Sequence, residues 1–227
     1  MTPHRSASRQ SATATRLLRR LASDRCGNAT IEMAIALPLL ISMGMYGTEI
    51  AYMATVNMEV SQIATSLADN ASRVGQTDNS SVTPTVTETD IDSVMSGVLR
   101  QGSGIGLGEN GRVILTSLER DSATGRQYIH WQRCTGDLDR ESGYGDDGAD
   151  NGLTGDLIPG LGKTGSLITA PSGSAVMYAE IFYEYQGLFG DMFVSDTVFK
   201  KEAAFLVRDD RNLTPGVTGT GGNSSCN

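Results

Sequence analysis

The chain of 227 residues has few of the residues that build metal sites and catalytic centres. It holds three cysteines, Cys26, Cys134 and Cys226, and two histidines, His4 and His130. The cysteines form no C-x-x-C pair, which is the usual arrangement in a structural zinc site. The sequence also places no nucleophile and no orienting partner near His130. We therefore expect no structural metal, no cofactor and no enzymatic activity.

Positive charge is scarce in most of the chain. Residues 1–27 carry six arginines and one acid, a net charge of +5, whereas residues 28–227 carry 12 basic and 25 acidic residues, a net charge of −13. Nucleic-acid binding requires Lys and Arg clustered on one face. The acidic body has no such surplus, so nucleic acid is excluded as a partner. The basic head and the acidic body are separate parts of the protein.

One long uncharged run follows the basic head. The sixteen residues from Met33 to Thr48 would extend about 24 Å as a helix, compared with about 30 Å for the hydrocarbon core of a bilayer. Apolar residues on both sides bring the segment to spanning length, about 29–53. Because the arginines precede it, the positive-inside rule places residues 1–27 in the cytoplasm and the body across the membrane.

A basic head that precedes an apolar run can be processed in several ways. A conventional signal needs a small-x-small cleavage site after the run, and the nearest, at 66–68, lies far downstream. A lipoprotein cysteine follows the apolar region, whereas Cys26 precedes it. Two alternatives remain open from the residues alone. One is an uncleaved membrane anchor, and the other is cleavage before the run, at Gly27.

The sequence GNATIE, residues 27–32, resembles the site cut by type IV prepilin peptidases, in which Glu is the fifth residue of the mature chain. With the following residues, GNATIEMAIALPLL resembles the N-terminal signature of TadE-like minor pseudopilins of the tight-adherence (Flp) pilus. Thr30, Glu32 and Pro38 carry this resemblance. A looser likeness extends to the segments 175–185 and 199–213. Met33 departs from the family pattern, which usually has Phe at this position. The difference changes the packing volume of the side chain and does not affect the expected cleavage.

The resemblance implies cleavage between Gly27 and Asn28, which exposes the α-amino group of Asn28. An acid in the centre of a membrane costs about 2.5–3.5 kcal/mol on insertion scales. The new amino group, of the same or a neighbouring subunit, would compensate Glu32 and set the axial register of an assembly, in which Thr30 and Pro38 also take part. The alternative is that Glu32 lies at the membrane–water interface of an uncleaved anchor.

The resemblance also implies function and location. The protein would be a membrane-anchored structural or initiating subunit of a tight-adherence pilus, in the bacterial inner membrane or incorporated in a surface pilus. Its N-terminus would be cytoplasmic and its C-terminal domain periplasmic. Its partners would be the prepilin peptidase, other pilin and pseudopilin subunits, the inner-membrane assembly platform and the lipid bilayer. The alternative function is an uncleaved single-pass anchor that carries a periplasmic ligand- or calcium-binding domain.

The sequence predicts an α+β, pilin-like fold in which a long N-terminal helix packs on a small antiparallel sheet. Residues 28–75 form the helix, which spans the membrane in its first half and becomes amphipathic beyond it. Residues 76–227 form the α+β domain, with a polar linker over 76–88 and a helix from Thr89 to about Arg100. Alternation over 175–185 directs Tyr183 toward the core and Glu180 to the opposite face. The four predicted strands are 112–121, 126–134, 175–185 and 199–210.

Two further segments are expected in the domain. The glycine-rich loop 136–156 offers carboxylates that can hold Ca²⁺, but it does not match the EF-hand spacing. We expect a solvated, mobile loop, with a weak calcium site as the alternative; its candidate ligands are Asp137, Asp139, Glu141, Asp146, Asp147 and Asp150. In an oxidising periplasm we expect Cys134 to pair with Cys226 in the flexible tail 212–227. That bond would contribute up to about 4–5 kcal/mol.

Overall fold

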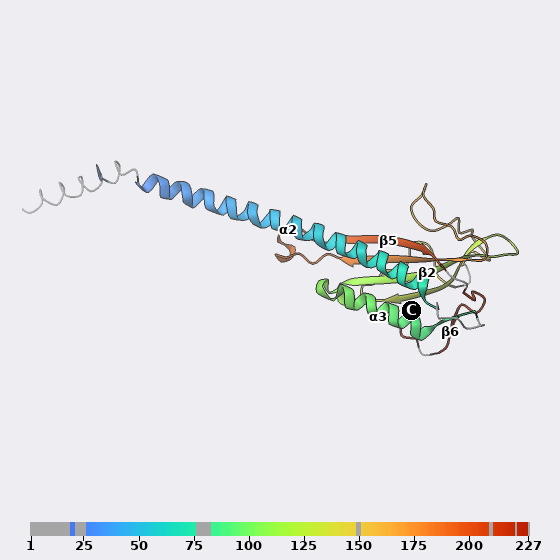
Figure 1. Cartoon of the computed structure of the whole chain (residues 1–227). Coiled ribbons are helices and arrows are strands. Elements are labelled where there is room, and N and C mark those ends of the chain that lie inside the picture. Colours follow the sequence, from blue (N-terminus) through green and yellow to red (C-terminus); the bar gives the residue numbers. More distant parts are fainter. Residues whose placement is uncertain are drawn as a thin grey trace, which may run out of the picture. The chain divides into compact units, whose positions relative to one another are not determined.

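A computed structural model describes residues 19–20, 26–75, 83–148, 151–208, 211–220 and 222–226. Most of the basic leader 1–27, and residues 76–82 of the expected linker 76–88, therefore lie outside the described residues. The chain divides into two compact units, Met1–Thr48 and Glu49–Asn227. Helix α2, Cys26–Arg73, contributes residues to both units (Figure 1).

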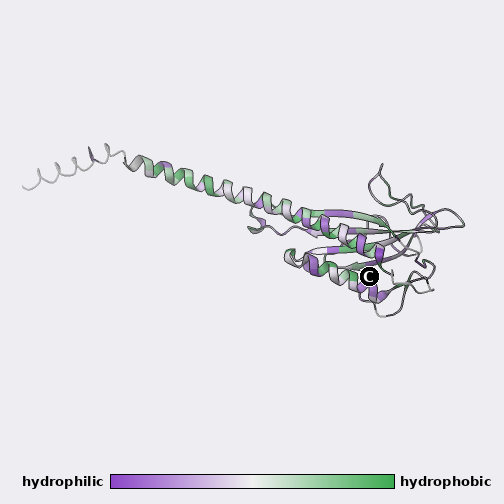
Figure 2. Cartoon of the chain, viewed as in Figure 1, coloured by the Kyte–Doolittle hydropathy of each residue, from purple (hydrophilic) through white to green (hydrophobic). Residues whose placement is uncertain are grey.

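In the first unit, α2 exposes large apolar side chains on all sides. A helix that is apolar all round is either buried in a large core or inserted in a membrane. By length and composition, α2 is able to cross a membrane, near the N-terminus of the chain. Figure 2 shows the apolar character of this part of the helix. The exposed fractions run from 47% to 76% for Ile31, Met33, Ile35, Leu37, Leu39, Leu40, Ile41 and Met43.

The second unit is built on the predicted four-stranded antiparallel sheet. Its strands are β2 (Gly111–Arg120), β3 (Gln127–Thr135), β4 (Ala175–Glu184) and β5 (Val198–Leu206), in the order β3-β2-β4-β5. The expected α+β class, with a long N-terminal helix and a small antiparallel sheet, is confirmed. Strand β5 ends at Leu206, earlier than the expected residue 210.

The main core lies between one face of the sheet and two helices. Helix α2 contributes its amphipathic second half, and α3 (Glu88–Gln101) packs on the same face. Helix α3 begins one residue before the predicted Thr89, because Thr87 and Asp90 form a reciprocal capping box at its N-terminus. The buried residues include Val56, Val60, Ile63 and Leu67 of α2, Ile91, Met95 and Val98 of α3, and Val113, Leu115, Met177, Ala179 and Ile181 of the sheet.

The opposite face of the sheet is covered by the long connection between β3 and β4. Tyr178 and Glu180 face it and are buried. Leu161 and Ala170 of the connection pack on this face, together with Tyr144. The acidic segment 136–156 is part of this connection. Most of its described residues are exposed, as expected of a solvated loop, whereas Tyr144 packs on the sheet.

The described part of the expected flexible tail 212–227 makes backbone contacts with the rest of the second unit. The Asn212 N–H donates to the Pro84 carbonyl, 3.0 Å away. The short strand β6 (Val217–Thr218) pairs in parallel with β1 (Val86–Thr87). Three short helical turns complete the unit: η1 (Gly102–Ile105), α4 (Leu107–Asn110) and η2 (Gly190–Met192).

Candidate functional site

The residues of the expected processing and assembly site lie at the start of α2. Gly27 and Asn28 are in its first turn, and the side chain of Asn28 lies outside what the structure describes. Glu32 is exposed and has no ionic partner among the described residues. Pro38 lies inside the helix, where its carbonyl accepts a hydrogen bond from Ser42 Oγ at 2.8 Å. Within the part of the chain that the structure describes, no cation therefore compensates the Glu32 carboxylate.

A second acid of α2, Glu49, lies in a very different environment. It is fully buried in the second unit. Its Oε1 accepts hydrogen bonds from Tyr185 Oη at 2.6 Å and from the Leu188 N–H at 3.2 Å, and its Oε2 accepts one from the Phe189 N–H at 3.1 Å. Three converging donors can hold a buried carboxylate without a cation, because hydrogen bonds to a charged acceptor are stronger than neutral ones.

Glu49 was missed as a site residue by the sequence reasoning. It follows the uncharged run directly, so its position predicted only a place within the segment 29–53. The structure assigns Glu49, with the partly buried Tyr52 and Met53, to the second unit. No local pattern shows that Tyr185 and the residues after it return to α2, because that contact depends on the tertiary arrangement.

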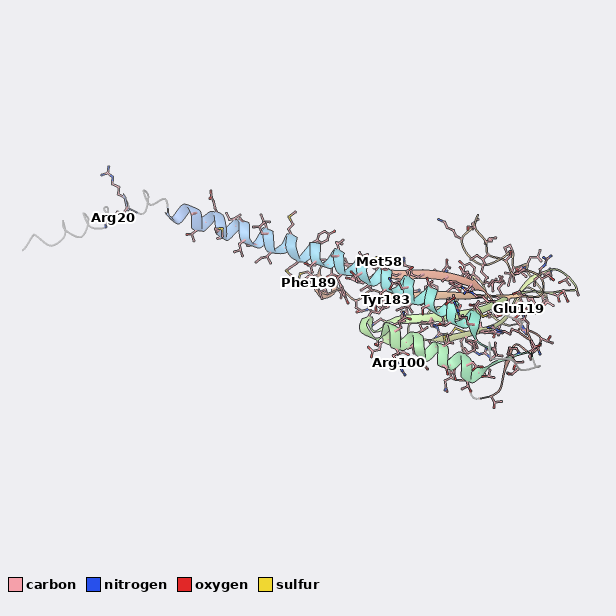
Figure 3. The ribbon with its side chains drawn as sticks, in the orientation of Figure 1. Arg20, Met58, Arg100, Glu119, Tyr183 and Phe189 are labelled. Atoms are coloured by element: carbon pink, nitrogen blue, oxygen red, sulfur yellow. A yellow bond between two sulfur atoms is a disulfide. The ribbon has the colours of Figure 1, made fainter. Side chains whose placement is uncertain are left out.

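A buried polar cluster lies at the other end of the sheet, around Glu119. Figure 3 shows Glu119 and Phe189 at opposite ends of the second unit. Glu119 Oε1 lies 3.0 Å from His130 Nδ1 and accepts a hydrogen bond from Ser117 Oγ at 3.1 Å. Glu119 Oε2 accepts one from Tyr128 Oη at 3.0 Å. The sequence placed no such partners near His130, so this grouping corrects that expectation.

The geometry of this cluster does not activate a nucleophile. In a serine nucleophile the hydroxyl donates to the histidine, whereas Ser117 donates to the carboxylate and is fully buried. The hydrogen bond with Glu119 raises the pKa of His130, against an opposing effect of burial. The arrangement holds β2 and β3 together through charge-assisted contacts, and it favours the protonated imidazole.

The expected calcium ligands are dispersed in the described residues. Asp147 Oδ2 accepts the Gln132 N–H at 3.1 Å and lies 3.6 Å from Arg133 Nη1. Asp146 Oδ1 accepts the Gly148 N–H at 2.9 Å, which closes a local turn. Among the described residues, which leave out Asp150, no group of three or more His, Cys, Asp or Glu side chains is placed to hold a metal ion. The calcium alternative therefore gains no support from them.

The cysteine pair expected from the sequence is present. Cys134, on β3, forms a disulfide with Cys226 across a sequence separation of 92 residues. The chain around Cys226 has further attachments: the Cys134 N–H donates to the Ser224 carbonyl at 2.7 Å, and Arg112 Nη2 donates to the Cys226 carbonyl at 3.2 Å. The disulfide thus fixes the C-terminal segment to the edge strand β3.

The described residues thus combine three features. The first half of α2 exposes apolar side chains, its second half packs on the sheet, and a disulfide fixes the C-terminal segment. Comparisons of the chain with protein-family models, with curated proteins and with solved structures gave no significant match.

Proposed function

We propose that the chain is a membrane-anchored minor pseudopilin of the TadE-like type. It would be cut after Gly27 by a prepilin peptidase and would then assemble with other pilin subunits as a structural or initiating subunit of a tight-adherence pilus. The single observation that carries this proposal is the division of α2. Its first half exposes apolar side chains on every side, whereas its second half is the central helix of a small α+β unit.

The exposed apolar side chains in the first half of α2 suit a helix that lies first in a lipid bilayer and later among the helices of an assembly. Burial of apolar surface contributes about 25 cal/mol per Å², so a helix with side chains this exposed is strongly driven out of water. A membrane satisfies that drive before assembly, and neighbouring helices of the same kind satisfy it afterwards. A single-pass anchor alone would need only the first of these environments.

Glu32 gives the second argument. The carboxylate lies in the apolar half of α2 and has no ionic partner among the described residues. Ionisable groups within membrane helices normally pair with one another or with other polar groups inside a bundle. Cleavage after Gly27 creates a new cation, the amino group of Asn28, within about one helical turn of Glu32 in the sequence. The same amino group can serve Glu32 of a neighbouring subunit.

The disulfide supports the proposed topology. Bonds of this kind persist in oxidising compartments such as the bacterial periplasm and are rare in the cytosol. Cys134 and Cys226 both belong to the second unit. A periplasmic second unit, with the arginine-rich leader on the cytoplasmic side, agrees with the positive-inside rule.

The proposal is tested by the N-terminus of the membrane-extracted protein. Mass spectrometry of the mature chain should find Asn28 as the first residue. A Gly27→Leu variant should accumulate a precursor about 3 kDa larger, since each of the 27 leader residues adds about 0.11 kDa. Gly44→Leu is the matched control, because a side chain at Gly44 meets no atom within 4 Å. Recovery of the native protein with Met1 or Thr2 first would instead support the uncleaved anchor.

The role of Glu32 is tested separately by Glu32→Gln. This variant should still enter the membrane fraction, because the substitution removes a charge from the apolar segment. It should co-purify with fewer pilin subunits, because the register-setting charge pair is lost. Glu59→Gln, on the part of α2 that belongs to the second unit, is the control. Wild-type levels of co-purified subunits for Glu32→Gln would contradict the proposed pairing.

A further inference from the structure

The connection between β4 and β5 contains a short apolar loop, residues 187–194. Leu188 and Met192 in this apolar loop are 51% and 68% exposed. The rings of Phe189 and Phe193 contact each other edge to face, with centroids 6.0 Å apart. Asp191 is the single charged residue of the apolar loop. Exposed apolar surface gathered in one place marks contact with a partner or with a membrane.

The apolar loop is fixed to one position along α2. The backbone N–H groups of Leu188 and Phe189 donate to the buried carboxylate of Glu49, at 3.2 and 3.1 Å. Gly187 permits this close approach, since a Cβ there would lie 2.9 Å from Glu49 Oε1 and would also meet the Gly190 carbonyl. The level of the apolar loop along the helix is therefore set by residue 49.

Residue 49 is also where the uncharged run of the helix ends. Glu49 directly follows Thr48, the last residue of that run, and one helical residue advances about 1.5 Å. If the hydrocarbon region ends with this uncharged run, the membrane surface lies at the level of Glu49. The side chains of the apolar loop, whose backbone lies on Glu49, reach the same level.

We propose that the apolar loop inserts into the headgroup region of the bilayer that holds α2, as a second membrane contact of the second unit. This inference rests on the proposed membrane anchoring and goes beyond it. Interfacial amphipathic helices bury their apolar face by about 5–10 Å at the boundary of headgroups and acyl chains, and the exposed Leu188 and Met192 offer side chains for a contact of this kind. Glu49 stays paired with its three donors, so no unpaired carboxylate meets lipid.

The charge of the apolar loop predicts whether its insertion depends on the headgroup charge of the lipid. The loop carries no basic residue and one acid, Asp191. Binding to anionic headgroups depends on Lys and Arg side chains and weakens with salt. Insertion of the apolar loop should therefore occur in neutral phosphatidylcholine and should not respond to salt.

The test uses the full chain reconstituted in phosphatidylcholine vesicles, with and without bromine on the acyl chains to quench tryptophan. Two variants place a tryptophan in the apolar loop, Met192→Trp and Leu188→Trp. Leu157→Trp is the matched control outside the loop, at a side chain that is 66% exposed. Leu40→Trp, in the uncharged run, reports insertion of α2 itself. The wild-type protein supplies the background of Trp131, which is 5% exposed.

The expected result is blue-shifted emission, quenched by the brominated lipid, for Leu40→Trp and for both loop variants, while Leu157→Trp stays unquenched. If both loop variants behave like Leu157→Trp while Leu40→Trp is quenched, the loop inference is overturned and membrane anchoring stands. A blue shift in the loop without quenching would show a protein contact and also overturn it. An unquenched Leu40→Trp would overturn the anchoring.

Discussion

At the scale of single residues, Glu49 shows how hydrogen bonds keep a carboxylate inside the second unit, where no described residue forms an ion pair with it. The two oxygens receive one hydroxyl and two backbone N–H groups. Buried charges that lack both a counter-ion and hydrogen bonds are strongly unfavourable. The hydrogen bonds of Glu49 therefore bind the end of β4 and the following loop to α2, and their loss should be visible in stability.

Glu49→Gln should lower the free energy of unfolding by about 1.5–3 kcal/mol, the usual contribution of a hydrogen bond to a charged group. The amide nitrogen of Gln would face an N–H or O–H donor where the carboxylate accepted one. Urea unfolding of the full chain in detergent micelles measures the difference. Glu59→Gln, on the same helix and partly exposed, should change stability by no more than about 0.5 kcal/mol. Equal unfolding midpoints for the two variants would contradict this role.

His130 gives the second unit a pH dependence. Because the Glu119 hydrogen bond raises the pKa of His130, protonated imidazole is favoured in the folded state. The resulting stability is fully present below the unfolded pKa, about 6.5, and is lost as the pH rises through the higher folded pKa.

His130→Gln should therefore reduce the thermal stability of the full chain more at pH 5.5 than at pH 8.5. Thermal unfolding in detergent at both pH values measures the effect, and the wild-type protein at the same two values corrects for other titrating groups. A stability difference between variant and wild type that is the same at both pH values would show that Glu119 does not stabilise the imidazolium.

At the scale of elements, the C-terminus of α2 is held by the partly buried Arg211. Arg211 Nη2 donates to the carbonyls of Ala71 and Val74, at 2.9 and 2.6 Å. These carbonyls have no partner within the helix, and a cation there also matches the helix dipole. Burial lowers the pKa of Arg211 to about 10, so the guanidinium remains charged at neutral pH.

Arg211→Met should destabilise the protein by about 1–3 kcal/mol, because it leaves buried carbonyl groups without a donor while keeping the apolar stem. Arg208→Met is the matched control. Arg208 is 49% exposed and forms a surface ion pair with Asp69 at 3.1 Å, so its loss should cost less than about 1 kcal/mol. Chemical unfolding of both variants gives the comparison, and equal losses would contradict the capping role.

At the scale of the whole molecule, one disulfide closes a loop that covers about half of the second unit. The Cys134–Cys226 bond joins β3 to the C-terminal segment, and Arg112 and Ser224 add hydrogen bonds at the same place. A closed loop of this length restricts the unfolded chain strongly in the chain-entropy model. The bond also protects the edge strand β3 by keeping the C-terminal segment beside it.

The double variant Cys134→Ser, Cys226→Ser should lose about 2–5 kcal/mol of stability. Thermal unfolding of the wild-type protein with and without reductant should reproduce the same loss. The double variant itself should not respond to reductant. A wild-type protein that keeps its unfolding temperature after complete reduction would show that the hydrogen bonds alone hold the C-terminal segment.

Much of the fold was predictable from local patterns. The uncharged run, the amphipathic continuation of α2 and the four strand segments depend on side-chain periods of 3.6 and 2, which neighbouring residues determine. The expected bounds differ by a few residues, as at Leu206, where β5 ends before the predicted residue 210. The start of α3 moved to Glu88 because the cap at Thr87 decides where the helix begins.

The candidate site was less predictable, because its contacts join distant segments. Glu49 lies more than a hundred residues from Tyr185 in the sequence. The local pattern predicted a membrane segment around Glu49 and a strand of the sheet around Tyr185. Alternation in β4 placed Glu180 on the face away from the core, but it could not show that residues of the β3–β4 connection would cover that face. The sequence likewise gave no sign that Ser117, Glu119 and His130 would meet.

The sequence by itself determined the charge asymmetry, the apolar segment, the helix and the strands, because each is a property of adjacent residues. The expected cleavage after Gly27 also belongs to the sequence, and it stays a prediction. Only the tertiary structure showed that Glu49 is buried in the second unit. A buried carboxylate needs hydrogen-bond donors, and those of Glu49 come from the β4–β5 connection. That long-range requirement placed an apolar loop at the same level of the helix.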